Sequence, residues 1–286
     1  MKQKIIYYTD EMNDDFAGTH IKPKIIDGNY KYRHHNIFWH FAAFFVYRIF
    51  ATPIIWFYLT FIRRVKYVNR KALKRCKSGY FIYGNHTQSV VDAFNPAMLA
   101  RPHRASIIVS PDAVSVPGLN MFIPILGGIP IPSTLQSTKN YLKYLKYLVS
   151  KKRAIFLYPE AHIWPYYNKI RNFPDHSFAY PIRFNTPAYA FVVLYRQRKI
   201  KKYKKPKITV IISNPFFPKD YDNDRTKLRN AIHDFMVDTI NKYGSYEYIK
   251  YQKIDINQKE GLCWILWGFM GSTKIKRRWF LWGHTK

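Results

Sequence analysis

A strand that runs into a polar turn and then a helix is the most constraining pattern in this chain, at residues 80–94, YFIYGNHTQSVVDAF. Tyr80–Tyr83 are uncharged β-forming residues, which is typical of a short buried strand. Gly84–Asn85 ends the strand, and Thr87 or Ser89 in the polar turn is a suitable N-cap for the helix that follows. The pattern predicts an α/β unit with polar side chains at the carboxyl end of a strand, where α/β enzymes usually carry their catalytic groups.

One carboxylate, Asp92, interrupts the apolar start of that helix. A buried carboxylate is costly unless it has a partner, and the nearest candidate is His86. Residues six apart on one helix point about 240° away from each other. The two side chains therefore meet only if His86 precedes the first turn and the chain curls back. Such a pair would be a general base with its orienting carboxylate; the alternative is a structural or capping role for His86.

Four sequence blocks together resemble the glycerolipid acyltransferases, the 1-acyl-glycerol-3-phosphate acyltransferase superfamily. Asn85-His86 with Asp92 resembles the family's N-H-x4-D motif, although H-x5-D here is one residue longer. Three later blocks follow in the family's order, and the second of them resembles F-P-E-G. They are Gly127-Gly128-Ile129-Pro130-Ile131-Pro132, Phe156-Leu157-Tyr158-Pro159-Glu160 and Thr186-Pro187-Ala188-Tyr189-Ala190-Phe191-Val192. The resemblance covers about residues 78–195.

The resemblance implies a fold and a chemistry. The fold is an α/β domain with a mixed β-sheet flanked by helices. In the reaction, His86 takes the proton of an acceptor hydroxyl while Asp92 holds the imidazole tautomer. Asn85, or backbone amides after Gly127, would stabilise the oxyanion. The residues expected to bind substrate are Asn85, Gly127, Gly128, Pro159, Glu160 and His162. No cofactor or metal is expected, and acyl-CoA or an acylated acyl carrier protein is the expected donor.

The chain departs from the family where phosphate-bearing acceptors are bound. Such family members carry one arginine that closes the second motif and another after the F-P-E-G block. The corresponding residues here are Ser133 and Ile163, and the motif glycine is Ala161. A bidentate guanidinium clamp cannot be built from serine and isoleucine.

Two alternatives follow for the acceptor. In the first, which we favour, it is a less charged alcohol such as a glycolipid or another hydroxylated lipid, hydrogen-bonded by Glu160. In the second, His162 together with Lys169 or Arg171 has taken over the phosphate.

Residues 37–62 form a long apolar and aromatic stretch, IFWHFAAFFVYRIFATPIIWFYLTFI. About 20 such residues can span a bilayer, but His40, Arg48 and Pro53 interrupt this stretch. Residues 28–91 contain eleven Lys and Arg and no acid. We therefore expect an amphipathic, membrane-associated helical pair that lies in the interface and is hinged near Pro53. A buried pair of core helices and a true span are the alternatives.

The charge balance requires an anionic partner. The chain has 47 Lys and Arg against 17 acids, a net charge of +30, and 18% aromatic residues, which together suit anionic membrane lipids. The run at residues 196–207 has eight Lys and Arg and is either a solvated loop or a headgroup-binding segment. Tryptophans beside cations at residues 264–282 suit interfacial anchoring. Two cysteines without metal-binding spacing fit a reducing compartment.

From these features we expect a monotopic protein at the cytoplasmic face of a membrane. Its expected partners are anionic lipids, an acyl thioester and a lipid-like alcohol. A basic nucleic-acid-binding protein is the first alternative function. No nucleic-acid motif is present, however, and the aromatics concentrate in apolar stretches, so no nucleic acid is expected. The second alternative is a catalytically inactive, lipid-binding family member.

The sequence divides into four expected segments. They are a polar N-terminal extension with little fixed structure (1–35), membrane-associating helices (36–75), an acyltransferase domain (76–245) and a basic aromatic tail (246–286). Besides Tyr80–Tyr83, strands are predicted at Ala105–Ser110, Gly127–Pro132, Ala154–Tyr158, Tyr189–Tyr195 and Ile208–Ser213. A helix is predicted to end at Val149 and another to cover Leu228–Tyr243.

Overall fold

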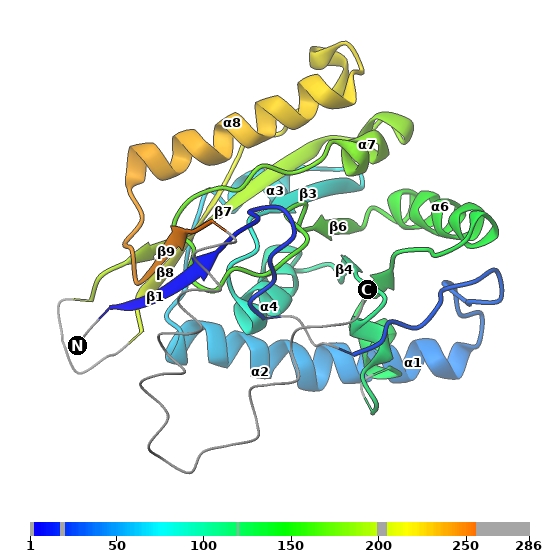
Figure 1. Cartoon of the computed structure of the whole chain (residues 1–286). Coiled ribbons are helices and arrows are strands. Elements are labelled where there is room, and N and C mark those ends of the chain that lie inside the picture. Colours follow the sequence, from blue (N-terminus) through cyan, green and yellow to red (C-terminus); the bar gives the residue numbers. More distant parts are fainter. Residues whose placement is uncertain (1–2, 18–20, 119, 199–204, 256–286) are drawn as a thin grey trace.

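Helices lie on both faces of one β-sheet in the computed structural model, which describes residues 3–17, 21–118, 120–198 and 205–255 (Figure 1). The strands are β1 (Lys4–Tyr8), β2 (Lys66–Val68), β3 (Tyr80–Gly84), β4 (Ala105–Val109), β5 (Gly128–Pro130), β6 (Ala154–Leu157), β7 (Ala188–Arg196), β8 (Lys207–Ile212) and β9 (Ile249–Lys253). The helices are α1 (Ile37–Phe45), α2 (Thr52–Phe57), α3 (Lys71–Arg75), α4 (Ser89–Leu99), α5 (Phe122–Ile125), α6 (Leu135–Ser150), α7 (Ala179–Arg183) and α8 (Arg225–Tyr243). The predicted strands are all confirmed.

The described residues form a seven-stranded mixed sheet in the order β2-β8-β7-β3-β6-β4-β5. Neighbouring strands are parallel except for β7 and β8, which are antiparallel. The central strands β3 and β6 are buried on both faces, which explains why they read as continuous apolar runs rather than as alternating patterns. The α/β fold with a mixed, helix-flanked sheet is thus confirmed.

Successive side chains of each central strand enter two separate cores, because they point to opposite faces of the sheet. In β3, Tyr80 and Ile82 pack in the core that contains α4 and the helix of residues 37–62, while Phe81 and Tyr83 pack in the core under α6, α7 and α8. In Figure 1 the first group of helices lies below the sheet and α8 above it. The sheet therefore lies between two helical layers.

Residues 37–62 form one long helix, so the expected hinged pair is wrong. The helix is continuous over 26 residues, because π-helical turns at Val46–Ala51 and Tyr58–Ile62 join α1 to α2 and extend α2. Pro53 lies in the first turn of α2, and the wide turn before it lets the Thr52 N–H bond to Tyr47 O. A widened turn accommodates a proline that would otherwise clash with the preceding carbonyl and bend the helix.

One stripe of the long helix packs on the domain along its whole length. This stripe consists of Ala43, Tyr47, Ile55 and Leu59, which are all buried. Most of the other large apolar side chains point outward: Ile37, Phe38, Phe41, Phe44, Phe45, Ile49, Phe50, Ile54, Trp56, Phe57, Phe61 and Ile62 are 44–80% exposed. By length and composition this helix could cross a membrane. Its exposed apolar face excludes the alternative of a buried core helix pair.

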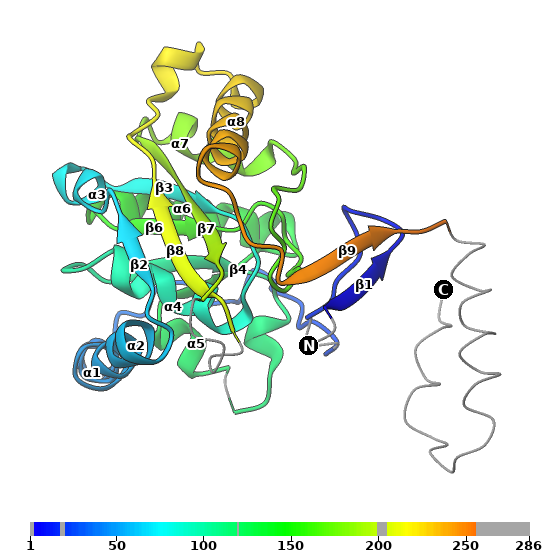
Figure 2. The same ribbon diagram turned by 90° about the vertical axis from the view of Figure 1, so that its left-hand side faces the viewer.

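The N-terminal residues have more fixed structure than we expected. Strand β1 pairs in parallel with β9, and Figure 2 shows this two-stranded ribbon projecting from the main body. Ile26 is fully buried, and its backbone carbonyl accepts a hydrogen bond from Ser133 N beyond β5. This contact covers an edge of the sheet that would otherwise expose unpaired backbone groups. Residues 264–282, and residues 199–204 of the basic run, lie outside the described part of the chain.

Replacing Tyr47 with phenylalanine tests how the long helix is attached. The Tyr47 hydroxyl accepts a hydrogen bond from Ala105 N at 3.1 Å, where β4 begins. Tyr47→Phe leaves that buried N–H without a partner, so the free energy of unfolding should fall by about 1–3 kcal/mol. Urea denaturation in detergent measures the change. Tyr246→Phe, at an exposed position, is the matched control; equal stability of the two variants would contradict the proposed attachment.

Candidate active site

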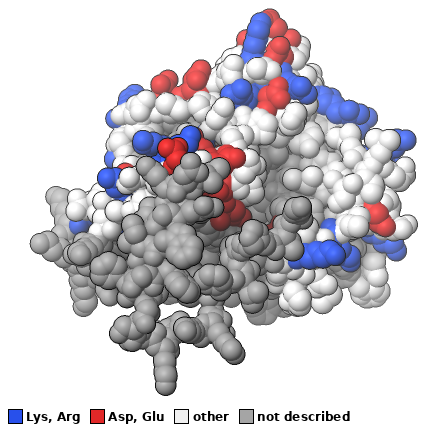
Figure 3. All heavy atoms as spheres, in the orientation of Figure 1, with Lys and Arg blue, Asp and Glu red and all other residues white. Residues whose placement is uncertain are grey.

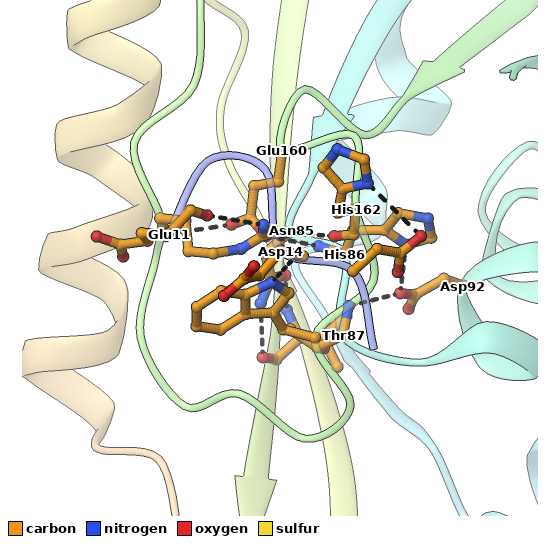
Figure 4. Close-up of polar contacts among 12 residues, drawn as sticks. Glu11, Asp14, Asn85, His86, Thr87, Asp92, Glu160 and His162 are labelled. Atoms are coloured by element: carbon orange, nitrogen blue, oxygen red, sulfur yellow. Dashed lines mark hydrogen bonds and ion pairs between the residues drawn. The ribbon is translucent and has the colours of Figure 1, made fainter. Parts of the chain in front are cut away.

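The candidate site lies at the carboxyl edge of the sheet, where β3 ends. His86 follows this strand by two residues and precedes α4, so the chain curls back as the predicted pairing requires. Its Nδ1 lies 3.0 Å from Asp92 Oδ2, and its side chain is 17% exposed. Figure 4 shows Asp92 on one side of His86 and Glu160 on the other. The structure thus brings together the two residues that the sequence singled out.

Asp92 organises the turn as well as the imidazole. The same oxygen, Oδ2, accepts hydrogen bonds from the backbone N–H groups of Thr87 and Gln88, both at 2.8 Å. These amides belong to the two residues just before α4, so the carboxylate in the first turn ties the preceding turn to the start of the helix. Neither Thr87 nor Ser89 is the N-cap that we predicted; that position is Gln88.

Burial is the main influence on the Asp92 carboxyl. The residue is fully buried, and within the described structure its Oδ1 has no hydrogen-bond partner. Burial raises the pKa of Asp92, whereas the hydrogen bond and charge of His86 and the two backbone donors act to lower it. A buried carboxyl that faces a histidine at the carboxyl edge of a sheet is a candidate for a functional pair.

Tyr158 is a residue of the site that sequence reasoning missed. Its ring stacks on the His86 imidazole with 4.4 Å between ring centroids, and its hydroxyl donates to the backbone carbonyl of Asp92. The tyrosine lies just after β6, in the block that resembles F-P-E-G. Its position next to Pro159 and Glu160 was the available signal. The stacked ring restricts the imidazole to one plane.

Glu160 supports the His86 turn from the side opposite Asp92. The carboxylate is almost completely buried and its Oε2 accepts from His86 N at 3.3 Å. The same oxygen lies 2.9 Å from Arg171 Nη2 in an ion pair whose side chains are both 1% exposed. Burial raises the pKa of Glu160, while the Arg171 charge opposes this shift. Glu160 is therefore occupied in the fold and does not have the free carboxylate that we expected to bind an acceptor hydroxyl.

Two further backbone contacts hold the turn in place. Trp164 N donates to His86 O at 3.1 Å, and Tyr166 N donates to Thr87 O at 2.9 Å. Trp164 is fully buried among aromatic rings contributed by the N-terminal segment, its own loop and β9. These rings are Tyr8, Phe16, Tyr167 and Tyr251, at 4.7–5.2 Å between centroids. The β1–β9 ribbon thus anchors the loop that fixes the candidate base.

The acidic N-terminal residues also reach this loop. Asp15 Oδ2 lies 3.5 Å from His162 Nδ1, and both side chains are partly exposed. Glu11 O accepts from Arg171 Nη1 at 3.3 Å, and Asp14 O accepts from Trp164 Nε1 at 2.7 Å. His162 is therefore near the site, as predicted, but it faces an aspartate that would repel an acceptor phosphate.

Three of the predicted substrate-binding residues, Asn85, Gly127 and Gly128, are engaged elsewhere in the fold. The Asn85 side chain is fully buried and bonds to both the N–H and the carbonyl of Val193, so it prolongs the pairing of β3 with β7. Gly127 and Gly128 lie at the start of β5, which is separated from β3 by two other strands. Gly127 N donates to Pro124 O, and a side chain at this left-handed residue (φ +99°) would clash with Ala105 O. Nothing in this geometry directs the proposed oxyanion donors at His86.

The positions that departed from the family pattern have structural contacts. Ser133 Oγ accepts from Ile26 N at the edge of the sheet. Ala161 has a left-handed backbone with φ 61°, which glycine adopts more easily. Within the described residues, no group of three or more His, Cys, Asp or Glu could hold a metal ion.

Comparison with known proteins identifies a structural neighbour. No protein-family model matches this sequence, and neither does any curated protein. The chain is similar to the crystal structure of the 1-acyl-sn-glycerophosphate (LPA) acyltransferase PlsC from Thermotoga maritima, with a TM-score of 0.51 and 16% sequence identity. The similarity covers 73% of this chain and 88% of that one. At this identity the comparison establishes a shared fold.

The Glu160–Arg171 pair gives a direct test of whether Arg171 is structural. Arg171→Met removes the partner of a buried carboxylate, so the free energy of unfolding should fall by about 3–5 kcal/mol. Lys169→Met, at an exposed position two residues away, should change it by less than about 0.5 kcal/mol. Denaturant titration measures both values, and the double variant Glu160→Gln/Arg171→Met should regain part of the loss.

If Arg171 instead bound an acceptor phosphate, Arg171→Met would unfold at the same denaturant concentration as Lys169→Met. That result would contradict the structural role.

Proposed function

We propose that this protein is a membrane-associated O-acyltransferase of the glycerolipid acyltransferase superfamily, acting on a lipid-like alcohol. The observation that carries the proposal is the His86–Asp92 pair at the carboxyl edge of the sheet, with Nδ1 held at 3.0 Å by a buried carboxylate. The shared fold with an LPA acyltransferase supports it. Residues 76–245 would be the catalytic domain and residues 36–75 the membrane-associating part.

The chemistry follows from which imidazole nitrogen is engaged. With Nδ1–H donating to Asp92, the lone pair of His86 is on Nε2. Nε2 accepts the proton of the acceptor hydroxyl while that oxygen attacks the carbonyl carbon of an acyl thioester. The tetrahedral intermediate then collapses, the C–S bond breaks, and the thiolate leaves with the proton returned by the imidazolium. Asp92 fixes the tautomer and favours the imidazolium formed on the way.

The geometry of the long helix supports a monotopic arrangement. Its buried stripe stays on the domain from Ala43 to Leu59, so a bilayer-crossing orientation would carry the domain into the membrane with it. A helix that lies in the interface instead buries its exposed phenylalanines among lipid chains and keeps the domain in water. Arg63, just after the last turn, donates to Gln88 beside the candidate base at 3.1 Å. The active site would thus open close to the membrane surface.

We propose a less charged alcohol, such as a glycolipid or another hydroxylated lipid, as the acceptor. The arginine considered for a rebuilt phosphate site is 1% exposed and paired with Glu160. His162, the other candidate, faces Asp15. An acceptor phosphate would have to compete with both carboxylates, whereas a neutral hydroxyl would not. The thioester donor, acyl-CoA or acylated carrier protein, is anionic and suits the net charge of +30.

Loss of the base should abolish acyl transfer without loss of the fold. His86→Ala should lower the rate of transfer from a labelled acyl-CoA to a membrane lipid extract by about 10²–10⁴-fold, the usual contribution of a positioned base. Asp92→Asn should lower it by much of the same factor.

The Asp92 variant should nevertheless not be destabilised at neutral pH. A carboxyl whose pKa is raised on folding stabilises the fold at acid pH, and that contribution is lost as the pH rises through the folded pKa. An uncharged asparagine avoids this cost, so the melting temperature at pH 7 should be unchanged or higher.

Turnover by His86→Ala close to that of the wild type would contradict the proposed base and leave only a lipid-binding role.

Competition between acceptors tests the choice of alcohol. Lysophosphatidic acid or glycerol 3-phosphate is mixed with a neutral glycolipid at equal concentration and a single acyl donor, and the products are separated by mass spectrometry. We expect the acylated glycolipid to dominate. A preference for lysophosphatidic acid that is lost in Lys169→Met would instead favour the rebuilt phosphate site.

A further inference from the structure

A basic pocket lies between the long helix and the edge of the sheet at which β4 and β6 begin, opposite the edge that carries His86. Its volume is about 480 Å³. One wall of the pocket is formed by helix residues that are spaced by three or four and so share a face. The other walls come from the residues just before β4, at the end of α6 and just before β6. The lining residues are His40, Phe44, Tyr47, Arg48, His103, Arg104, Tyr147, Lys151 and Arg153.

The lining carries four permanent cations and no carboxylate. In the part of the chain that the structure describes, no ion pair joins Arg48, Arg104, Lys151 or Arg153 to an acid. Burial lowers the pKa of Arg104, and the neighbouring Arg153 adds to this effect. Like charges gathered without a counterion repel one another, so an anion bound among them is favoured. The pocket therefore has the electrostatics of an anion site.

The pocket is separate from the candidate active site. Arg104 and Arg153 immediately precede the parallel strands β4 and β6, whereas His86 follows β3. A strand of five residues places the two sites about 15 Å apart or more. In Figure 3, Lys and Arg side chains are spread over the visible face, interspersed with Asp and Glu. No step of the acyl transfer described above uses these residues.

The apolar rim of the pocket identifies the kind of anion. Phe44 lines the pocket and is also 58% exposed on the outer face of the helix, and Phe41, one turn earlier, is 71% exposed. A molecule with its phosphate on Arg48 and Lys151 could thus lay apolar chains along these two rings. This combination of an acidic head beside an apolar surface belongs to a phospholipid in the interface.

We propose that this pocket binds the phosphate headgroup of an anionic phospholipid whose acyl chains follow the exposed face of the helix. The bound lipid would be a structural partner and not a substrate. It would hold the N-terminal half of the helix at headgroup depth, while the other end of the helix reaches the turn that carries His86. The lipid would therefore set the depth at which the active site meets the membrane.

Binding of short-chain lipids below their critical micelle concentration tests this site without a bilayer. Isothermal titration calorimetry compares dihexanoyl phosphatidylglycerol, dihexanoyl phosphatidylcholine and inorganic phosphate. We expect saturable one-to-one binding of the phosphatidylglycerol. Arg48→Gln/Lys151→Gln should weaken it by about 30-fold, since each cation near a headgroup contributes about a 5-fold factor in affinity.

The matched control is Arg64→Gln/Lys66→Gln, which removes two cations next to the end of the same helix but outside the pocket. It should bind phosphatidylglycerol within about twofold of the wild type, and so should His86→Ala. If the double pocket variant fails to fold, Lys151→Gln, at an exposed residue, should still show about a 5-fold loss.

Three results would overturn the proposal. They are no saturable binding of phosphatidylglycerol, equal losses in the pocket and control variants, or inorganic phosphate or phosphatidylcholine binding as tightly as phosphatidylglycerol. These readouts do not depend on acyl transfer, so an inactive enzyme would leave the lipid site untouched.

Discussion

A single oxygen atom, Asp92 Oδ2, holds the candidate active site together. It accepts hydrogen bonds from the Thr87 and Gln88 backbone and lies 3.0 Å from His86 Nδ1, so one buried carboxylate closes the turn, starts α4 and orients the imidazole. Glu160 completes the arrangement from the other side through His86 N and is itself held by Arg171. Two buried acids therefore fix one histidine, which is preorganisation of the kind that catalysis requires.

The sequence predicted this centre because a buried Asp92 needs a partner and His86 is the nearest candidate. Other predictions failed where the outcome depended on long-range geometry. Pro53 does not bend the long helix, because the π-helical turn before it makes room for the proline ring. The N-cap of α4 was predicted wrongly, because the Asp92 side chain, and not that of Thr87 or Ser89, accepts from the backbone N–H groups there. Gly127 was assigned to the site from the order of the motifs along the chain, but in the sheet two strands separate β5 from β3. The N-terminal segment docks on Trp164, whose Nε1 donates to Asp14 O across 150 residues of sequence. No local sequence pattern reveals such a contact.

The long helix links the two ends of the domain. Its buried stripe attaches it to the sheet, its outer face is apolar, and its two ends lie at chemically different sites. Near the start it borders the basic pocket; after its end, Arg63 contacts Gln88 next to the candidate base. The two residues considered for a rebuilt phosphate site both face acids, because Arg171 pairs with Glu160 inside the fold and His162 faces Asp15. These contacts are the reason why we propose a less charged acceptor at the reaction centre, whereas the cations that we propose to bind a phosphate line the basic pocket.

The tautomer of His86 tests the role of Asp92 most directly. Long-range ¹H–¹⁵N correlation spectra of the protein labelled with ¹⁵N-histidine, at a pH where the ring is neutral, report which nitrogen carries the proton. A buried carboxylate acceptor at Nδ1 predicts the Nδ1–H form in the wild type, with an unprotonated Nε2, and loss of that preference in Asp92→Asn. A wild-type ring protonated on Nε2 would contradict the assignment of His86 as the base.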